Sequence, residues 1–361
     1  MDALNVGGAA DRDEVLALLV LDGAPGVGLV GLRALVDRFG SAADALRQPA
    51  TACREVCRRY VAPRADDWRA AAEALDHAAR LGMEVVTWSD LRYPDALLNL
   101  HDPPPILFLR GRVELLEGPS ITVVGSRRAT SRSRDVAERL GGALARAGVC
   151  VVSGMALGID GAAHAGALEA DGDTVAVLGR GADEAYPRSH RRLFRSILEA
   201  GLVVSEFAPG TPPLTHHFPR RNRILAALAE AVVVVEAGAR SGALITVDHA
   251  LDLGLEVWAV PGPIDLKACA GSNRLLADGA RPLLGIREFV TEVSGEDVSP
   301  PRRPEGKEGR VLTALEAMPL NVDELTERLE MPAAEVLTLL TRLELAGVVR
   351  RMPGMRFGAA A

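Results

Sequence analysis

The stretch ITVVGSR, residues 121–127, decides the fold. Its four β-branched residues, 121–124, predict a short buried strand. Gly125 permits a tight turn, and Ser126 and Arg127 stand just before a predicted helix over 133–146. A strand, a glycine turn and a helix start together present free backbone N–H groups to an anion. The arginine at the tip of the turn indicates that the anion is a phosphate.

Similar strand signals recur along the middle of the chain. They lie at 84–88, 106–110, 149–152, 174–178, 202–205, 232–236 and 256–260. Helix-like stretches or long loops separate them, which predicts a parallel sheet covered by helices on both faces. We therefore expect an α/β fold with a Rossmann-like domain over residues 83–292. Ligands of such open sheets bind beyond the carboxyl ends of the strands.

The region before this domain, residues 1–82, is predicted to be a helical domain of the SAM or helix-hairpin-helix kind. Short helices are expected over 12–48, with a hairpin at Gly26-Val27-Gly28, and a further helix over 66–81. In helix-hairpin-helix modules such a hairpin offers N–H groups to DNA phosphates. Because few basic residues flank it in the sequence, packing or docking is the favoured interpretation and DNA contact the alternative.

The region after this domain begins with a predicted linker, residues 293–308, rich in proline, glycine and charge. Residues 309–361 predict three helices and a β-hairpin, which is a winged helix. Asn321 and Glu324 form a capping box at the second helix, and Pro353-Gly354 turns the hairpin. The third helix would normally read a major groove. Its expected exposed positions are Glu335, Thr338, Thr341, Arg342 and Glu344, which are not basic overall. Weak DNA affinity, protein contact or autoregulation is therefore expected, and Arg350, Arg351 and Arg356 on the wing leave DNA binding open.

The composition excludes several classes of protein. The net charge of −7 argues against a bulk nucleic-acid binder, but only two of the 41 basic residues are lysines and the arginines cluster. The clusters lie at 127–134, 188–195 and 220–223, which predicts a locally basic groove on an acidic protein. No apolar run is long enough to cross a bilayer and no signal peptide is visible, so we expect a cytoplasmic protein without membrane contact. The four cysteines are too few and badly spaced for a metal site.

Five loops should gather at the carboxyl edge of the sheet. They are 125–127, 153–164, 179–193, 218–224 and 236–246, which bring backbone amides, hydroxyls and arginines. The stretch GSRRATSR after the first strand is not a GxGxxG fingerprint, and the sequence has no P-loop. Ser153, Asp160 and His164 lack the GxSxG context of a hydrolase, and a structural contact between Asp160 and His164 is the preferred interpretation. We therefore predict anion binding, with no catalytic residue, metal or cofactor.

The loop motifs resemble the DNA-processing protein A (DprA/Smf) family. The resemblance rests on VVGSRRAT, SGMALGIDGAAHAGAL, TVAVLGRGADEAYP, FPRRNRI, VVVVEAGARSGALIT and AVPGPI, in this order, preceded by YPDALLNLHDPPPILFLRG. It covers about residues 90–285. One departure is that Arg188, after Tyr186-Pro187, and Leu214-Thr215 stand where some relatives have lysines.

The resemblance implies a bacterial cytoplasmic protein that binds single-stranded DNA during natural transformation, protects incoming strands and helps to load the RecA recombinase. It also implies a homodimer through the Rossmann-like domain and no catalytic activity. By the family pattern, Arg127, Arg220, Asn222 and Arg223 hold backbone phosphates, and Ser153 and Gly154 line the same pocket. Together with neighbouring loop positions, the predicted DNA-binding set is Gly125, Ser126, Arg127, Ser153, Gly154, Arg188, Arg220, Asn222, Arg223, Ser241 and Gly242.

The sequence favours two other functions less. A nucleotide-processing enzyme similar to the lysine-decarboxylase-like phosphoribohydrolases would carry PGGxGTxxE, whereas residues 236–248 read EAGARSGALITVD. A winged-helix regulator with an α/β sensor domain is disfavoured by the weakly basic third helix. The few aromatic residues near the loops, Tyr186, Phe207 and Phe218, allow limited base stacking, so recognition should be sequence-tolerant.

Overall fold

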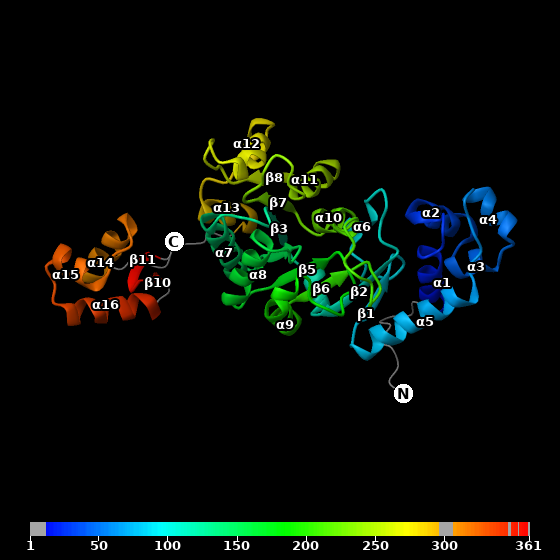
Figure 1. The fold of residues 1–361 in the computed structure, drawn as a ribbon, viewed down its shortest axis with the longest axis horizontal. Helices are drawn as coiled ribbons and strands as arrows, with labels where there is room; N and C mark the ends of the chain where they lie inside the picture. Colours follow the sequence, from blue (N-terminus) through cyan, green and yellow to red (C-terminus); the bar gives the residue numbers. More distant parts are fainter. Residues whose placement is uncertain (1–11, 296–305, 346–347, 353, 360–361) are drawn as a thin grey trace. The chain divides into compact units, whose positions relative to one another are not determined.

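The chain divides into two compact units in a computed structural model that describes residues 12–295, 306–345, 348–352 and 354–359. The boundary between the units, after Glu296, falls inside the predicted linker, and the second unit holds the predicted winged helix (Figure 1). None of the described helices is both long and apolar enough to span a membrane.

The helices and strands of the first unit confirm the predicted alternation. The helices are α1 (Arg12–Asp22), α2 (Gly28–Phe39), α3 (Ala42–Arg47), α4 (Ala50–Val56), α5 (Ala65–Arg80), α6 (Asp95–Leu98), α7 (Ser131–Arg146), α8 (Ile159–Glu169), α9 (Arg191–Ala200), α10 (His217–Ala227), α11 (Ala243–Asp252), α12 (Ala270–Ala277) and α13 (Ile286–Ser294), with short 3-10 turns η1 (Val113–Leu116), η2 (Arg188–His190) and η3 (Lys267–Cys269). The strands are β1 (Glu84–Thr87), β2 (Ile106–Gly111), β3 (Ser120–Val124), β4 (Cys150–Ser153), β5 (Thr174–Leu178), β6 (Leu202–Ser205), β7 (Ala231–Val234), β8 (Glu256–Ala259) and β9 (Arg281–Pro282).

The nine strands form one sheet in the order β1-β2-β6-β5-β4-β3-β7-β8-β9. The predicted parallel sheet is confirmed from β3 to β9, whereas at one edge β2 pairs antiparallel with both β1 and β6. No helix lies between β1 and β2 except the single turn α6, so the chain folds straight back there. The two-residue strand β9 was not predicted, since it is too short to give a periodic signal.

The strand order places a topological switch point beside β3. The chain continues from β3 to β4 on one side, whereas β7 joins β3 on the other side. A crevice therefore opens at the carboxyl ends of β3 and β7, which is where open α/β sheets bind ligands. The GSR turn that follows β3 lies at this crevice.

Helices cover both faces of the sheet, as expected from continuous apolar strands. α7, α8 and α9 contact one face, and α10 and α11 contact the other (Figure 1). Helix α7 begins at Ser131, two residues earlier than predicted, because Thr130 caps it: its Oγ1 accepts the Ser133 N–H at 3.2 Å.

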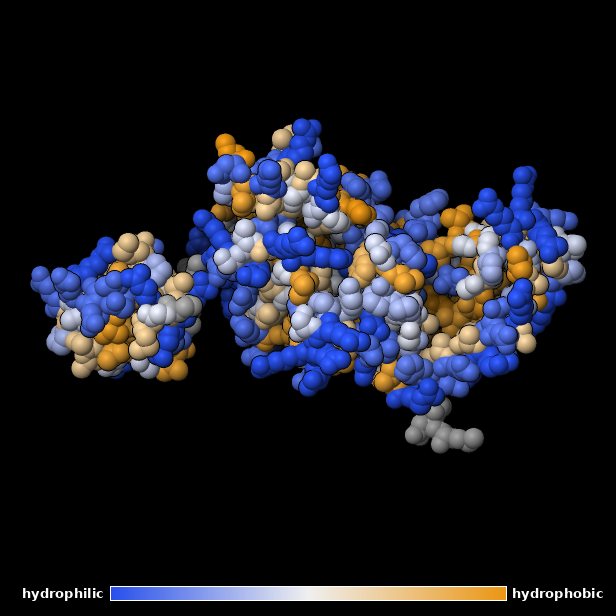
Figure 2. Space-filling model, viewed as in Figure 1, coloured by the Kyte–Doolittle hydropathy of each residue, from blue (hydrophilic) through white to orange (hydrophobic). Residues whose placement is uncertain are grey.

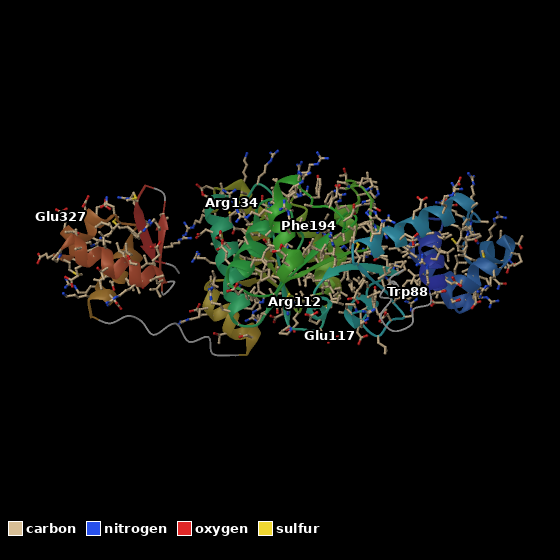
Figure 3. The ribbon with its side chains drawn as sticks, turned by 90° about the horizontal axis from the view of Figure 1, so that it is seen from below. Trp88, Arg112, Glu117, Arg134, Phe194 and Glu327 are labelled. Carbon is tan, nitrogen blue, oxygen red and sulfur yellow. The ribbon has the colours of Figure 1, made fainter. Side chains whose placement is uncertain are left out.

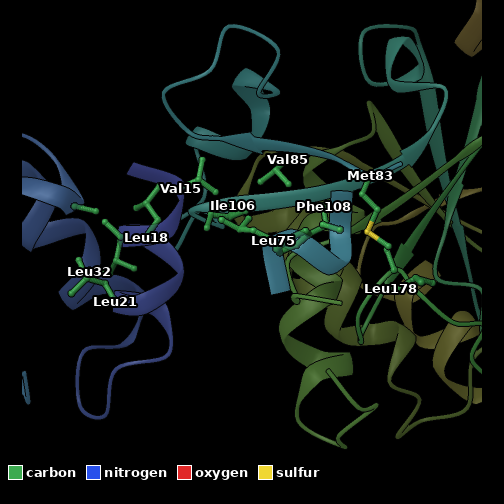
Figure 4. Close-up of a cluster of buried hydrophobic side chains, with 14 of the residues drawn as sticks. Val15, Leu18, Leu21, Leu32, Leu75, Met83, Val85, Ile106, Phe108 and Leu178 are labelled. Carbon is green, nitrogen blue, oxygen red and sulfur yellow. The ribbon is translucent and has the colours of Figure 1, made fainter. Parts of the chain in front are cut away.

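The N-terminal helices share a hydrophobic core with the sheet. Val15 and Leu18 of α1 lie in one buried cluster with Ile106 and Phe108 of β2 and Leu75 of α5 (Figure 4). Trp88, which follows β1 and is labelled in Figure 3, lies beneath the Arg33 guanidinium of α2 at 5.2 Å from the ring centroid. Residues 12–82 therefore pack as part of the first unit.

The second unit has the predicted winged-helix elements: α14 (Gly306–Ala317), α15 (Val322–Leu329), α16 (Ala333–Leu345) and the antiparallel pair β10 (Val349–Met352) and β11 (Arg356–Ala359). The capping box of Asn321 and Glu324 is confirmed. The ends of the predicted linker are helical in α13 and α14, and its residues 296–305, like Pro353 of the wing turn, lie outside the described residues.

On the face drawn in Figure 2, hydrophilic residues separate small hydrophobic areas.

Candidate nucleic-acid interface

A pocket of about 750 Å³ opens at the switch point between β3 and β7. Its walls come from the GSR turn after β3, from α10 and from the loop that leads into α11. Six of the eleven predicted site residues line it: Gly125, Ser126, Arg127, Asn222, Ser241 and Gly242. All five predicted loops reach the pocket: 125–127 lines it in full, 218–224 and 236–246 contribute several residues each, and the other two loops add Ala156, Asp160 and Tyr186.

The GSR turn is held by close backbone packing. The Ser126 N–H donates to the Glu236 carbonyl at 2.7 Å, and the Ser126 carbonyl accepts the Ile159 N–H at 3.3 Å. A Cβ at Gly125 would lie 2.5 Å from Ile159 Cγ1, and one at Gly158 would lie 2.2 Å from the Ser126 carbonyl oxygen. Glycine is therefore required at both positions for the turn to approach α8.

Gly158→Ala is expected to destabilise the protein by more than about 1 kcal/mol, because the residue has φ of +83° and no room for a Cβ. The matched control is Gly118→Ala, where φ is ordinary and nothing lies within 4 Å of the added carbon. Urea unfolding of both variants measures the difference. An equal, small effect of the two changes would contradict the packing described here.

Three arginines at the pocket are exposed and form no ion pair within the described part of the chain: Arg127, Arg128 and Arg240. The Arg127 guanidinium lies 4.9 Å from the ring centroid of Phe218, and the rings of Phe218 and Tyr186 are 5.5 Å apart. These contacts place a cation and two aromatic rings on one wall of the pocket. The wall can therefore bind a phosphate and contact an adjoining flat group.

Arg221 lies buried under the pocket. Its Nη1 donates to the carbonyls of Gly154, at 3.0 Å, and Val177, which joins the ends of β4 and β5. Burial lowers the pKa of Arg221 to about 10, and the neighbouring Asp160 carboxylate opposes that shift, so the guanidinium stays charged at neutral pH. Burial raises the pKa of Asp160, whose Oδ2 accepts the Ala156 N–H at 3.3 Å. This pair supports the pocket floor.

Arg220 and Arg223 do not line the pocket, contrary to prediction. Both Nη atoms of Arg223 donate to Glu206 at 2.8 Å, and its Nε lies 3.2 Å from Asp102. Arg220 Nε donates to the same Glu206 at 2.9 Å. Burial lowers the pKa of Arg223, but its bonds to Glu206 outweigh burial and raise the pKa above the ordinary value. Both guanidiniums are bound to Glu206, because a carboxylate buried away from water is stable only when it is paired with cations.

The remaining predicted residues occupy other places. Ser153 is buried and donates from Oγ to the Val123 carbonyl at 2.6 Å, and Gly154 lies below the pocket against Arg221. Arg188 begins the turn η2 and is exposed, but it does not line the pocket. Asn222 lines the pocket while its side chain bridges Arg221 Nε and the Gly242 carbonyl, so it also fixes the start of α11.

His164 takes Thr174 as its partner rather than Asp160, so the predicted contact between Asp160 and His164 is wrong. Nδ1 lies 2.6 Å from Thr174 Oγ1, whose own hydrogen is donated to the Val151 carbonyl at 2.7 Å. Nδ1 therefore carries the hydrogen of a neutral ring. Complete burial lowers the pKa of His164 to about 3. Ser153, Asp160 and His164 thus belong to three separate hydrogen-bond arrangements.

This histidine makes stability depend on pH. The pKa of His164 in the folded protein lies below its ordinary value of 6.5. Between these two pKa values the unfolded chain binds a proton at this histidine and the folded chain does not. The free energy of unfolding therefore decreases as pH falls from 6.5 toward 3. Between pH 7.5 and 5 we expect a loss of about 2 kcal/mol from this group. Urea unfolding at both pH values, with His164→Gln as the control, isolates it. An identical pH dependence in the variant would contradict the assignment.

Sequence reasoning missed Arg128, Arg221 and Arg240 as site residues. Arg128 and Arg221 adjoin predicted positions, but the direction of each side chain depends on turn geometry that one sequence does not fix. Arg240 directly precedes Ser241-Gly242 in the predicted loop 236–246, and its positive charge is the feature of the sequence that could have marked it as a site residue. Among the described residues, no group of three or more His, Cys, Asp or Glu side chains could hold a metal.

The fold defines a protein with a Rossmann-like domain, an arginine-bearing pocket at its switch point and a winged helix. The family model of DNA recombination-mediator protein A matches residues 84–294, and that of the DprA winged helix domain matches residues 296–355. The chain belongs to the DNA recombination-mediator protein A (DprA/Smf) family.

Individual relatives agree with this assignment. Protein Smf of Escherichia coli (strain K12) is 39% identical over 275 residues, covering 73% of this chain and 74% of that protein. DNA processing protein DprA of Streptococcus pneumoniae (strain ATCC BAA-255 / R6) is 41% identical over 200 residues, covering 55% and 71%.

Two solved structures are also similar. The X-ray structure of the S. pneumoniae protein has a TM-score of 0.66 and 30% identity, covering 78% of this chain and 97% of that one. A structure concerning the single-stranded DNA binding mode of the Helicobacter pylori protein has a TM-score of 0.54 and 28% identity, covering 59% and 97%.

Proposed function

We propose that this protein binds single-stranded DNA in the pocket at the ends of β3 and β7. The observation that carries the proposal is the set of three exposed, unpaired arginines, Arg127, Arg128 and Arg240, around a glycine-lined pocket. Guanidinium groups bind phosphate oxygens with two parallel hydrogen bonds. The relative from H. pylori, for which a single-stranded DNA binding mode is described, supports the choice of ligand.

Recognition is expected to be sequence-tolerant. The pocket offers guanidiniums and backbone groups for phosphates, and Tyr186 and Phe218 as ring surfaces for one or two bases. Stacking on aromatic rings accepts any base, because every base has a π face. The DNA strand would therefore be bound mainly through its backbone.

The winged-helix unit is a weaker candidate for the DNA site. Arg342 of α16 lies 3.7 Å from Glu308, Arg351 of the wing lies 3.6 Å from Glu344, and Arg356 lies 2.5 Å from Glu324. These arginines already have carboxylate partners, so phosphate contact would require breaking an ion pair. Duplex DNA binding or protein contact through this unit stays a prediction.

Binding without bond-making chemistry is part of the proposal. Within the described residues, the pocket lining carries the hydroxyls of Ser126, Tyr186, Thr215, Ser241 and Thr246 and includes no histidine. Asp160, the carboxyl group of the pocket lining, is buried next to Arg221 and accepts a backbone N–H. The alternative of a nucleotide-processing phosphoribohydrolase has no further observation in its favour.

The family supports a wider role for the proposed binding. We propose that the protein acts in the cytoplasm during natural transformation, protects incoming strands and loads RecA onto them, as a homodimer through the Rossmann-like domain. The match to a recombination-mediator family supports this role. Sedimentation velocity tests the homodimer, and RecA filament assembly on strands covered by a single-strand binding protein tests loading. A monomer in sedimentation would contradict the homodimer. RecA filament assembly that is unchanged by the protein would contradict RecA loading.

Fluorescence anisotropy across a salt series tests the proposed binding. Labelled oligo-dT should bind more tightly than the matched duplex, and log K should fall with log salt with a slope of about −2, which corresponds to three phosphates at about −0.7 each. Absence of single-strand binding at low salt would reject the proposal and turn attention to nucleotide substrates.

A further inference from the structure

The hairpin between α1 and α2 carries an exposed basic patch that the sequence does not reveal. Arg54 lies in the last turn of α4, Arg58 and Arg59 lie in the turn after it, and Arg59 lies against the hairpin glycine Gly26. A Cβ on Gly26 would lie 2.3 Å from the Arg59 carbonyl oxygen, so the two turns are in direct contact. We call Gly26, Gly28, Arg54, Arg58 and Arg59 the hairpin patch.

The three arginines of the hairpin patch are free to bind an anion. All three are exposed and form no ion pair within the part of the chain that the structure describes. Arg54 Nε donates to the Tyr60 carbonyl at 3.2 Å, which keeps this side chain on the turn. Glu55 is the one acidic residue in 54–60, so the segment keeps a net charge of +2, from three arginines minus one glutamate.

The hairpin backbone adds neutral donors to this positive surface. Cys57 Sγ donates to the Gly26 carbonyl at 3.4 Å, so the acceptor of this peptide is satisfied within the protein. The N–H groups of Gly26 and Gly28 have no partner among the described residues. Positive φ angles of +82° and +57° at these glycines shape the hairpin.

The hairpin patch is connected to the pocket through α10. Asp22, the last residue of α1 before the hairpin, lies 3.7 Å from Arg220 of α10. The same helix lines the pocket with Phe218, Pro219 and Asn222. Arg220, which was predicted to hold phosphate, thus joins the hairpin segment to the helix that forms the pocket wall.

We infer that the hairpin patch is a second DNA contact, at which Arg54, Arg58 and Arg59 bind backbone phosphates of the strand that occupies the pocket. This inference rests on the proposed function, because it concerns the same strand. A polyanion matches the unpaired positive charge, and a surface of guanidiniums and backbone amides reads no base. Packing alone does not require three exposed, unpaired arginines.

The test compares two lengths of oligo-dT by anisotropy in the full-length protein. A short oligonucleotide of about 6 nucleotides fits the pocket, whereas one of about 25 nucleotides extends beyond it. In the double variant Arg58→Glu/Arg59→Glu we expect affinity for the long strand to fall at least about tenfold and its salt slope to shrink by about 1.4. Affinity for the short strand should stay unchanged.

The matched control is Arg12→Glu/Arg69→Glu, which makes the same charge change away from the hairpin. Arg12 pairs with Asp76 at 2.8 Å and Arg69 with Asp66 at 3.0 Å, both exposed. Circular dichroism melts confirm folding of each variant, and Arg58→Ala/Arg59→Ala gives a milder change of the same sign.

The outcomes separate this inference from the proposed function. The inference is overturned if the hairpin double variants bind the long strand as tightly as the wild type, or if the control variant loses as much affinity. In either case the affinity of Arg127→Ala for oligo-dT still tests binding in the pocket. Loss of short-strand binding in the hairpin variant but not in Arg127→Ala would overturn both the second-contact assignment and the pocket as main site.

Discussion

Arg127→Ala is expected to weaken binding of oligo-dT by about tenfold to 100-fold. Arg127 stands at the tip of the GSR turn, exposed, with its guanidinium 4.9 Å from the Phe218 ring centroid. Removing it deletes a charge-assisted contact to phosphate and the cation beside the aromatic wall. The salt slope should shrink by about 0.7, as one phosphate contact is lost. Anisotropy at several salt concentrations measures both effects.

Arg112→Ala is the control for this experiment. Arg112 follows β2 at the opposite edge of the parallel strands, where its backbone N–H donates to the Gly201 carbonyl at 2.9 Å (Figure 3). Its guanidinium pairs with Glu114 and Asp173, both partly exposed. Affinity should be unchanged in this variant. Equal losses in both variants would mean that net charge, rather than the pocket, governs binding.

Glu206→Ala is expected to lower the free energy of unfolding by about 3–5 kcal/mol. The Glu206 carboxylate is buried and accepts hydrogen bonds from Arg220 and Arg223 at 2.8–2.9 Å. Removing it leaves the buried Arg223 guanidinium without its main partner, next to the Asp102 carboxylate at 3.2 Å. Urea or guanidinium unfolding measures the change.

Glu114→Ala is the matched control, because Glu114 pairs with Arg112 at 3.0 Å on the surface with 64% of its side chain exposed. A loss of no more than about 0.5 kcal/mol is expected there. A similarly small effect at Glu206 would contradict the account that Arg220 and Arg223 are structural rather than phosphate-binding.

The central fold was predictable because its signals are local. Runs of β-branched residues mark β3, β5 and β7, and the helix after the GSR turn has a capping threonine. The antiparallel edge formed by β1 and β2 was not predictable, since strand direction depends on the length and path of the connection. The family motifs identified the loops that meet at the switch point.

The site was predicted in part, and the misses have one cause. Arg220, Arg221 and Arg223 are close in sequence, but the helix sends them in different directions. Arg221 points under the pocket, whereas Arg220 and Arg223 contact Glu206, which directly follows β6 and lies 14 and 17 residues before them in the sequence. The spacing of the arginines in the sequence does not indicate that two of them form ion pairs with one buried carboxylate.

Photo-crosslinking tests the location of the DNA most directly. An oligo-dT carrying 5-iododeoxyuridine is irradiated on the full-length protein, and the modified peptides are identified by mass spectrometry. The pocket account predicts crosslinks at Tyr186 or Phe218, the aromatic residues of its wall, and their loss in Arg127→Ala. Crosslinks confined to the second unit, unaffected by Arg127→Ala, would contradict it.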